Sequence, residues 1–195
     1  MFTGIIETGG IVTSIEAKGT NLTFEIASSL SSSFTIDQSI SHDGVCLTVE
    51  TVDEDKHTVT AIEETLNKTN LRHWKPGSVV NIERCMQMNG RLDGHIVQGH
   101  IDTTGKCITR LDRGGSWEFS FEMDEHFASL IIEKGSISIN GISLTLFNVT
   151  RKSFTVAIIP YTFEHTNLKN LQVNELVNIE FDMIGKYVNR IHSLG

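Results

Sequence analysis

Two stretches of the chain carry a side chain capable of nucleophilic chemistry at corresponding places. Cys46 and Ser143 each stand soon after a glycine turn, near the start of a strand-like run, and Thr48 and Thr145 follow two residues later. Alternate residues of a strand point to the same face, so each threonine shares a face with the thiol or hydroxyl before it. A thiol or hydroxyl can act as a nucleophile when its proton is removed, and threonine can hydrogen-bond a polar ligand. The structural alternative is that all four are small strand or turn residues.

Two histidines stand together in the segment between these stretches. His95 and His100 both carry an imidazole that titrates near neutrality, and we assign the role of proton shuttle to His100. A pair of histidines also suggests zinc, but no third ligand stands nearby at metal-binding spacing, so we predict no metal site. The structural alternative for either ring is a hydrogen bond to the backbone between two folded units.

Composition and charge limit the classes of function. The 195 residues carry a net charge of −8 without a basic face, which argues against nucleic-acid binding. Three cysteines with long spacings and no CxxC predict neither a disulfide framework nor a structural zinc site. No apolar run approaches the roughly 20 residues that span a bilayer, and the N-terminus lacks the pattern of a signal peptide. We therefore expect no membrane association and a cytoplasmic location.

The chain repeats itself at a constant offset. Residues 39–49 resemble residues 136–146, which stand 97 positions later. Four further segments match at the same offset: 24–25 with 121–122, 58–59 with 155–156, 69–71 with 166–168, and 81–83 with 178–180. A gapless match over more than half of each copy indicates two copies of one module of roughly 90 residues.

Each module has the pattern of β structure, with alternating runs rich in β-branched residues and phenylalanine. The runs are 22–26, 39–41, 46–51, 58–62 and 79–83 in the first module, and 117–123, 136–139, 143–149, 154–159 and 176–181 in the second. Asp43-Gly44 and Asn140-Gly141 predict tight turns between strands. So many short strands in a small module indicate a closed or nearly closed barrel. Short helices are predicted at 63–71 and 161–168, and a C-terminal helix at 184–194.

Motifs along nearly the whole chain resemble the riboflavin synthase family. The matching segments are 1–7, 44–49, 64–66, 69–71, 81–84, 94–102, 134–135, 140–145, 159–160, 162, 177–180 and 182. The chain departs from the family pattern at Asn67, where arginine is common, at Asp43, where the turn residue is usually asparagine, and in a short tail after Asp182.

This resemblance implies an all-β fold: two similar six-stranded antiparallel Greek-key barrels in tandem, plus a short C-terminal helix. It divides the chain into an N-terminal lumazine-binding barrel (1–90), an inter-barrel junction (91–100), a C-terminal lumazine-binding barrel (101–184) and the C-terminal helix (185–195). It implies a homotrimer whose active sites lie between the N-barrel of one subunit and the C-barrel of the next. An association with lumazine synthase is a further expectation.

The resemblance also implies the reaction, the last step of riboflavin biosynthesis. Two molecules of 6,7-dimethyl-8-ribityllumazine are dismutated into riboflavin and 5-amino-6-(D-ribitylamino)uracil by transfer of a four-carbon unit, without metal or organic cofactor. The methyl group on carbon 7 of the lumazine is acidic, so the reaction needs proton transfer, a nucleophile that adds to the donor ring, and tight positioning of two rings.

The resemblance assigns roles to particular residues. Ser143, Asp182, Cys46 and His100 are the expected catalytic residues, with the Asp182 carboxylate accepting the Ser143 proton or orienting a water. The expected substrate-binding residues are Gly4, Ile5, Ile6, Ser39, Cys46, Leu47, Thr48, Ile62, Glu63, Glu64, Thr65, Gly99, His100, Ile101, Lys134, Ser143, Leu144, Thr145, Ile159, Pro160, Tyr161, Thr162, Phe163 and Glu164. Lys134 is expected to meet the pteridine carbonyl or its developing charge.

Three other functions remain alternatives. A non-catalytic lumazine- or flavin-binding protein of the same fold would bind in one barrel and lack the active-site residues. A flavin-dependent oxidoreductase would need a partner domain for the nicotinamide, and the chain has no GxGxxG phosphate loop. A structural barrel repeat would bind no ligand. The presence of every expected catalytic residue favours the enzyme.

Overall fold

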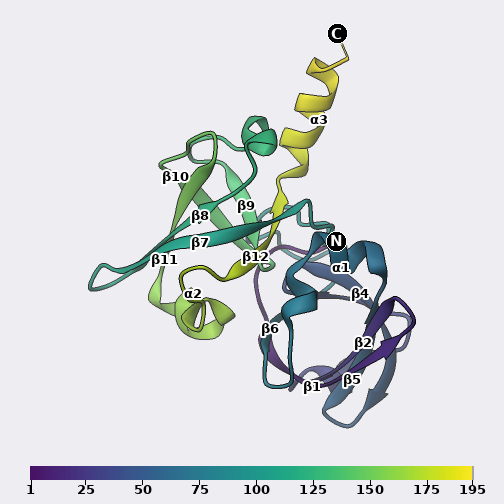
Figure 1. The fold of residues 1–195 in the computed structure, drawn as a ribbon. Helices are drawn as coiled ribbons and strands as arrows, with labels where there is room; N and C mark the ends of the chain where they lie inside the picture. Colours follow the sequence, from purple (N-terminus) through teal and green to yellow (C-terminus); the bar gives the residue numbers. More distant parts are fainter. Residues whose placement is uncertain (195) are drawn as a thin grey trace.

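The computed structural model describes residues 1–194 and contains two closed antiparallel barrels of six strands each, followed by a C-terminal helix (Figure 1). The first barrel consists of β1 (Thr8–Lys18), β2 (Asn21–Ala27), β3 (Ser39–His42), β4 (Val45–Asp53), β5 (Lys56–Ala61) and β6 (Val79–Arg84). The second consists of β7 (Thr103–Asp112), β8 (Trp117–Glu122), β9 (Ser136–Ile139), β10 (Ile142–Phe147), β11 (Ser153–Ile158) and β12 (Leu176–Phe181). Neighbours follow the order β1-β2-β5-β4-β3-β6 and, equivalently, β7-β8-β11-β10-β9-β12. The predicted pair of Greek-key barrels is confirmed.

Helices fill the connections at equivalent places in the two barrels. α1 (Glu63–Lys68) and α2 (Pro160–His165) follow the fifth strand of each barrel, and η2 (Asn70–His73) and η4 (Asn167–Lys169) come directly after them. The remaining 3-10 turns are η1 (Ser31–Ser33) and η3 (Glu125–Leu130). α3 (Met183–His192) projects away from the second barrel (Figure 1). Gly195, the last residue of the predicted C-terminal helix, lies outside the described residues. Among residues 1–194, no helix is long and apolar enough to cross a membrane.

Each barrel has its own hydrophobic core, built from alternate residues of its strands. The first core includes Phe24, Val49 and Ile82, and the second includes Phe121 and Leu146. Alternation of inward apolar and outward polar side chains is the pattern from which the strands were predicted. The two cores are separate, which agrees with two copies of one module.

The sequence prediction missed the first strand of each barrel, β1 and β7. Gly10 and Gly105 occupy the same place in these strands, because a Cβ at either would collide with the isoleucine of the last strand, Ile82 or Ile179. These glycines stand 95 residues apart rather than 97, since the β7–β8 turn is two residues longer than the β1–β2 turn. The offset of 97 residues therefore holds from the second strand of each barrel onward and does not apply to the first strand.

The two barrels meet at their predicted tight turns. Asp43, Gly44, Asn140 and Gly141 all have left-handed backbone angles, with φ of 48°, 79°, 45° and 81°. A Cβ on Gly44 would lie 2.7 Å from the Gly141 nitrogen, and a Cβ on Gly141 would lie 2.8 Å from the Gly44 nitrogen. Glycine is therefore required twice, for the turn conformation and for the contact between barrels.

Candidate active site

Cys46, Thr48, Ser143 and Thr145 lie on the outer faces of the barrels. Cys46 and Ser143 are half-buried, and Thr48 and Thr145 are exposed beside them. The residues that alternate with them point into the cores: Val45, Leu47 and Val49 in β4, and Ile142, Leu144 and Leu146 in β10. The side chains of Leu47 and Leu144, two of the expected substrate-binding residues, thus support the site from inside the barrel.

Each outer face is covered by the segment that leads into the other barrel. The Ser143 amide in the second barrel donates to the Gly4 carbonyl at 2.8 Å, and the Cys46 amide in the first barrel donates to the Gly99 carbonyl at 2.8 Å. Both glycines have positive φ, and a Cβ on either would lie 2.6 Å or less from the Cβ of the strand residue beneath it. Ile6 likewise packs on the second core and Ile101 on the first.

The two covering segments also pair with each other. Phe2 and Val97 form an antiparallel bridge, in which the Phe2 amide donates to Val97 at 2.7 Å and the Val97 amide donates to Phe2 at 3.1 Å. The two candidate faces are therefore built alike and joined through one strand pairing.

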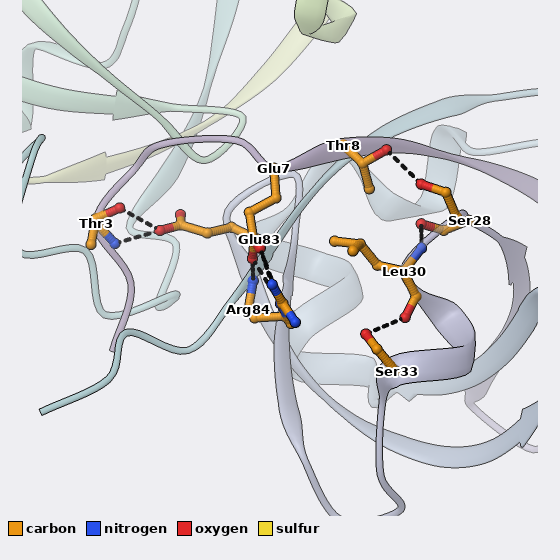
Figure 2. Close-up of polar contacts among 9 residues, drawn as sticks. Thr3, Glu7, Thr8, Ser28, Leu30, Ser33, Glu83 and Arg84 are labelled. Atoms are coloured by element: carbon orange, nitrogen blue, oxygen red, sulfur yellow. Dashed lines mark hydrogen bonds and ion pairs between the residues drawn. The ribbon is translucent and has the colours of Figure 1, made fainter. Parts of the chain in front are cut away.

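A buried glutamate holds each covering segment in place. Glu83 accepts hydrogen bonds from the Thr3 amide and hydroxyl at 2.6 Å and from the Gly4 amide at 3.0 Å, and Figure 2 shows the Thr3 contacts. Glu180 accepts from the amides of residues 98–100 at 2.6 to 2.9 Å. Burial raises the pKa of both carboxyls, and the donated hydrogen bonds oppose that rise. Figure 2 also shows the ion pair of Glu7 with Arg84, which ties down the end of the first segment.

The polar partner of Ser143 is His95. Its Nδ1 lies 2.7 Å from the Ser143 hydroxyl, and its backbone amide donates to Thr3 at 3.1 Å. Burial lowers the pKa of His95, while the charge of Asp182 raises it. The ring is therefore poised as a neutral base that can accept the Ser143 proton. Sequence reasoning assigned the proton shuttle to His100, whose side chain is exposed and whose backbone amide donates to Glu180 at 2.9 Å.

Asp182 acts at a distance from Ser143. Its carboxylate accepts from the Ile184 amide at 3.0 Å and caps α3, and it influences His95 through its charge. Among residues 1–194, no hydrogen bond joins Asp182 to Ser143, and the charge of Asp182 acts on the histidine that contacts Ser143.

The corresponding face of the first barrel has different chemistry. Burial raises the pKa of the Cys46 thiol, and the Ser39 side chain opposes that rise. Cys85 donates to the Ser39 carbonyl at 3.2 Å and stands 97 residues before Asp182. Sequence reasoning gave Cys85 no role, although the repeat offset pairs it with a catalytic candidate. Among residues 1–194, no group of three or more histidine, cysteine, aspartate or glutamate side chains could hold a metal ion.

Exposed apolar side chains border both faces. Ile62 and Ile159 precede α1 and α2 and are 54% and 62% exposed. The β4–β5 pairing ends at Val49 and Val59, and the β10–β11 pairing ends at Leu146 and Val156. Each isoleucine therefore follows the fifth strand where that strand parts from the strand of Cys46 or Ser143. Ile5 and Tyr161, two other expected substrate-binding residues with large side chains, are also exposed, and so is the basic Lys134. Large apolar side chains in these positions need a ligand or a partner to cover them.

The remaining expected residues lie in α1 and α2. Glu63 and Glu64 are exposed in the first turn of α1, and Thr65 is half-buried behind them. Pro160 begins α2; Glu164 is exposed there and Thr162 is half-buried. Phe163 is buried and stacks on Trp117 with ring centroids 3.8 Å apart. It therefore supports α2 from the inside and is not part of the exposed surface.

Comparisons with known proteins agree with this construction. The lumazine binding domain family matches residues 3–85 and 98–182, one match for each barrel. The solved structure of LumP complexed with riboflavin has a TM-score of 0.87, covers 93% of this chain and 99% of its own, and is 20% identical, so it shares the fold.

Relatives at higher identity are riboflavin synthases. That of Mycobacterium tuberculosis is 41% identical over 200 residues, which cover 98% of each chain. That of Actinobacillus pleuropneumoniae is 40% identical over 191 residues, covering 97% of this chain and 89% of the relative. That of Bacillus subtilis is 38% identical over 192 residues with the same coverage. The chain therefore belongs to the riboflavin synthase family and is an enzyme of that family.

Proposed function

We propose that the chain catalyses the dismutation of two 6,7-dimethyl-8-ribityllumazine molecules into riboflavin and 5-amino-6-(D-ribitylamino)uracil by four-carbon transfer, without metal or organic cofactor. The observation that carries this proposal is the pair of equivalent outer faces, each with a strand residue, Cys46 or Ser143, beneath a glycine of a crossing segment. Two faces of like construction suit two molecules of one substrate. Bringing two reactants together in a fixed geometry can supply roughly 7–11 kcal/mol of the barrier.

The acid–base chemistry belongs to the face on the second barrel. His95 takes the proton of the Ser143 hydroxyl, or of a water in its place, and the oxygen adds to the ring of the lumazine bound there. Asp182 stabilises the imidazolium that forms. Cys46 keeps its proton because burial raises its pKa, so we assign it a contact with the second lumazine rather than covalent chemistry.

The proposed assembly is a homotrimer in which the faces of neighbouring subunits enclose the two lumazines. Its support is apolar surface that the single chain leaves uncovered. Ile184, Tyr187, Val188 and Ile191 follow helical spacing along α3, and each is at least 61% exposed. Figure 1 shows the C-terminal part of α3 extending beyond the barrels, where other subunits can pack on it. The family resemblance also supports a cytoplasmic location and an association with lumazine synthase.

Incubation of the purified chain with the lumazine, followed by riboflavin absorbance, tests this function. Steady riboflavin formation without added metal or nicotinamide is the expected result. The same assay on Ser143→Ala, alongside a binding titration, separates catalysis from binding. Tight lumazine binding without turnover by the wild-type chain would refute the proposal and favour a lumazine-binding protein. Sedimentation of the wild-type chain as a monomer at assay concentration would refute the trimer.

A further inference from the structure

A buried network of asparagines joins the two barrels, with one carboxyl group among them. Asp43 accepts from the Asn81 amide at 2.7 Å, and in the other barrel Asn140 accepts from the Asn178 amide at 2.8 Å. The side chain of Asn178 then crosses to the Asp43 carbonyl at 2.9 Å, and that of Asn81 crosses to the Asn140 carbonyl at 3.0 Å. Each contact has its twin 97 residues away, so the network is nearly symmetric.

The two halves of the network differ in the contacts that Asn167 and its counterpart Asn70 make. The Asn167 side chain donates from Nδ2 to Asp43 Oδ1 at 2.8 Å, and its Oδ1 accepts from Asn81 Nδ2 at 2.9 Å and from Asn140 Nδ2 at 3.4 Å. Its twin is Asn70, which is 8% exposed. Within residues 1–194, no group donates to Asn70 Oδ1, although this oxygen is buried.

Asn167 Oδ1 has two donors, and Asn70 Oδ1 lacks the counterparts of both: the Asn178 side chain donates only to the Asp43 carbonyl within residues 1–194, and position 43 carries a carboxyl in place of an amide. The backbone amides of Asn70 and Asn167 bind Asn178 and Asn81 in the same way, at 2.7 and 2.8 Å, so the twins occupy equivalent positions. By this equivalence, the atom that faces Asn70 Oδ1 is the counterpart of Asn140 Nδ2, which is Asp43 Oδ2. An unprotonated carboxylate can only accept, so it cannot supply the hydrogen bond that Asn70 Oδ1 lacks.

We propose that the Asp43 carboxyl is protonated in the folded enzyme near neutral pH, that its O–H donates to Asn70 Oδ1, and that its ionisation weakens the contact between the two barrels. A neutral carboxylic acid has one donor and so reproduces the amide of its twin. Asp43 is 2% exposed, which makes a buried charge there costly.

The surroundings of Asp43 favour the neutral form. Burial raises its pKa to about 8, although hydrogen bonds from Asn81, Asn167 and Trp74 lower it. Three other ionisable side chains line the cavity of about 680 Å³ that Asp43 also lines: His73 and Lys75 from the first barrel, and Glu175 from the second. None of these three donates to or accepts from the Asp43 side chain within residues 1–194.

The position of Asp43 gives its protonation a route to the candidate active site. Gly44 follows it and packs directly on Gly141 of the other barrel. Cys46 and Ser143 come two residues after these glycines. A charge that loosens the turn contact therefore acts on the spacing of the two outer faces.

The test compares the full-length wild type with Asp43→Asn, which copies the twin Asn140. A group whose pKa is raised in the folded state holds a proton there that the unfolded chain releases, so stability falls as pH rises through that range. The ordinary aspartate pKa is 3.8 and the folded value is about 8. We therefore expect the wild-type unfolding constant, divided by that of Asp43→Asn, to rise about tenfold per pH unit between about pH 5 and 7.5. A ratio that is constant, or that falls with pH, overturns the proposal.

Two further measurements keep the test decisive. In Asp43→Asn, the indole N–H of Trp74 can lose the acceptor that Asp43 provides, and the variant can then fail to fold. The double variant Asp43→Asn/Trp74→Leu removes that N–H by copying Leu171, the counterpart of Trp74 in the second barrel, and restores folding. In the wild type labelled with ¹³C at the aspartate carboxyl carbons, one resonance should titrate above pH 7 and be absent from the variant. If every aspartate titrates below about pH 5, near its ordinary value, the carboxyl is ionised at neutral pH and the proposal fails.

Discussion

Replacing a buried histidine pair in the first barrel should remove a loss of stability between about pH 7 and pH 5. The His57 Nε2 atom lies 2.8 Å from the Nε2 atom of His42, and its Nδ1 lies 2.8 Å from the Ser31 hydroxyl. His42 Nδ1 lies 3.2 Å from the Ile40 carbonyl, so it must be the donor there. In the neutral pair, His42 Nε2 accepts from His57 Nε2 and His57 Nδ1 accepts from Ser31, and charging both rings would set two N–H groups against each other. A charge on even one ring is disfavoured because burial removes the water that would solvate it.

The magnitude follows from the difference in pKa between the unfolded and folded chain. Burial lowers the pKa of His42 to about 3 and that of His57 to about 4, from an ordinary value of 6.5. Below pH 6.5 the unfolded chain binds protons that the folded chain cannot, so stability falls as pH falls. Each histidine contributes about 1.4 kcal/mol per pH unit, which gives roughly 2 kcal/mol each and roughly 4 kcal/mol together from pH 7 to pH 5.

The second barrel provides the replacement residues. Ala128, Ile139 and Phe154 stand 97 residues after Ser31, His42 and His57, so the variant is S31A/H42I/H57F. Urea unfolding of both proteins at pH 5, 6 and 7, at one protein concentration, gives the difference in stability at each pH. Asp43 is present in both proteins, so its opposite pH dependence cancels. Parallel stability curves would refute the argument, because they would mean that the pair is protonated in the folded state or exposed to solvent.

Three other predictions concern the site and the assembly. Ser143→Ala should lower kcat by about 100-fold or more while changing lumazine affinity little, and equal losses in both would contradict its role. Gly99→Ala places a Cβ 2.5 Å from its neighbour and should cost roughly 1–3 kcal/mol in urea unfolding. Gly19→Ala, also at positive φ but with nothing within 4 Å, is the matched control, and equal losses would contradict the crossing-segment packing. Lys186→Ala removes a 2.6 Å ion pair between α3 and Asp102 and should raise the concentration at which the trimer dissociates, measured by sedimentation.

Strands with clear alternation could be predicted from the sequence, and the strands that close each barrel could not. β1 and β7 carry Gly10 and Gly105 where the chain passes close to the last strand. Glycine weakens a strand pattern, and its reason here is a contact with Ile82 or Ile179 that only the folded barrel creates. The longer β7–β8 turn then shifts these strands away from the repeat offset.

The site residues also divide into those that the sequence could predict and those that it could not. The repeat pairs Cys46 with Ser143 because both lie within one module at a fixed offset. His95 has no such signal, because the residues before the second barrel stand 95 positions from their twins, and its own twin would precede Met1. Its contact with Ser143 depends on the crossing of two segments, which is a property of how the barrels pack and not of either module.

The pattern of what the two barrels share and where they differ fits the proposed reaction. The parts that hold the covering segments in place are duplicated: Glu83 with Glu180, and Gly4 with Gly99. The groups proposed to react are not, since Ser143 and Asp182 have Cys46 and Cys85 as their counterparts, and His95, which contacts Ser143, has no counterpart in the repeat. In a dismutation both molecules must be bound in the same way, but only one gives up the four-carbon unit. Equal binding surfaces with unequal acid–base groups are therefore what such a reaction requires, and a scaffold duplicated only for stability would give no reason for the difference.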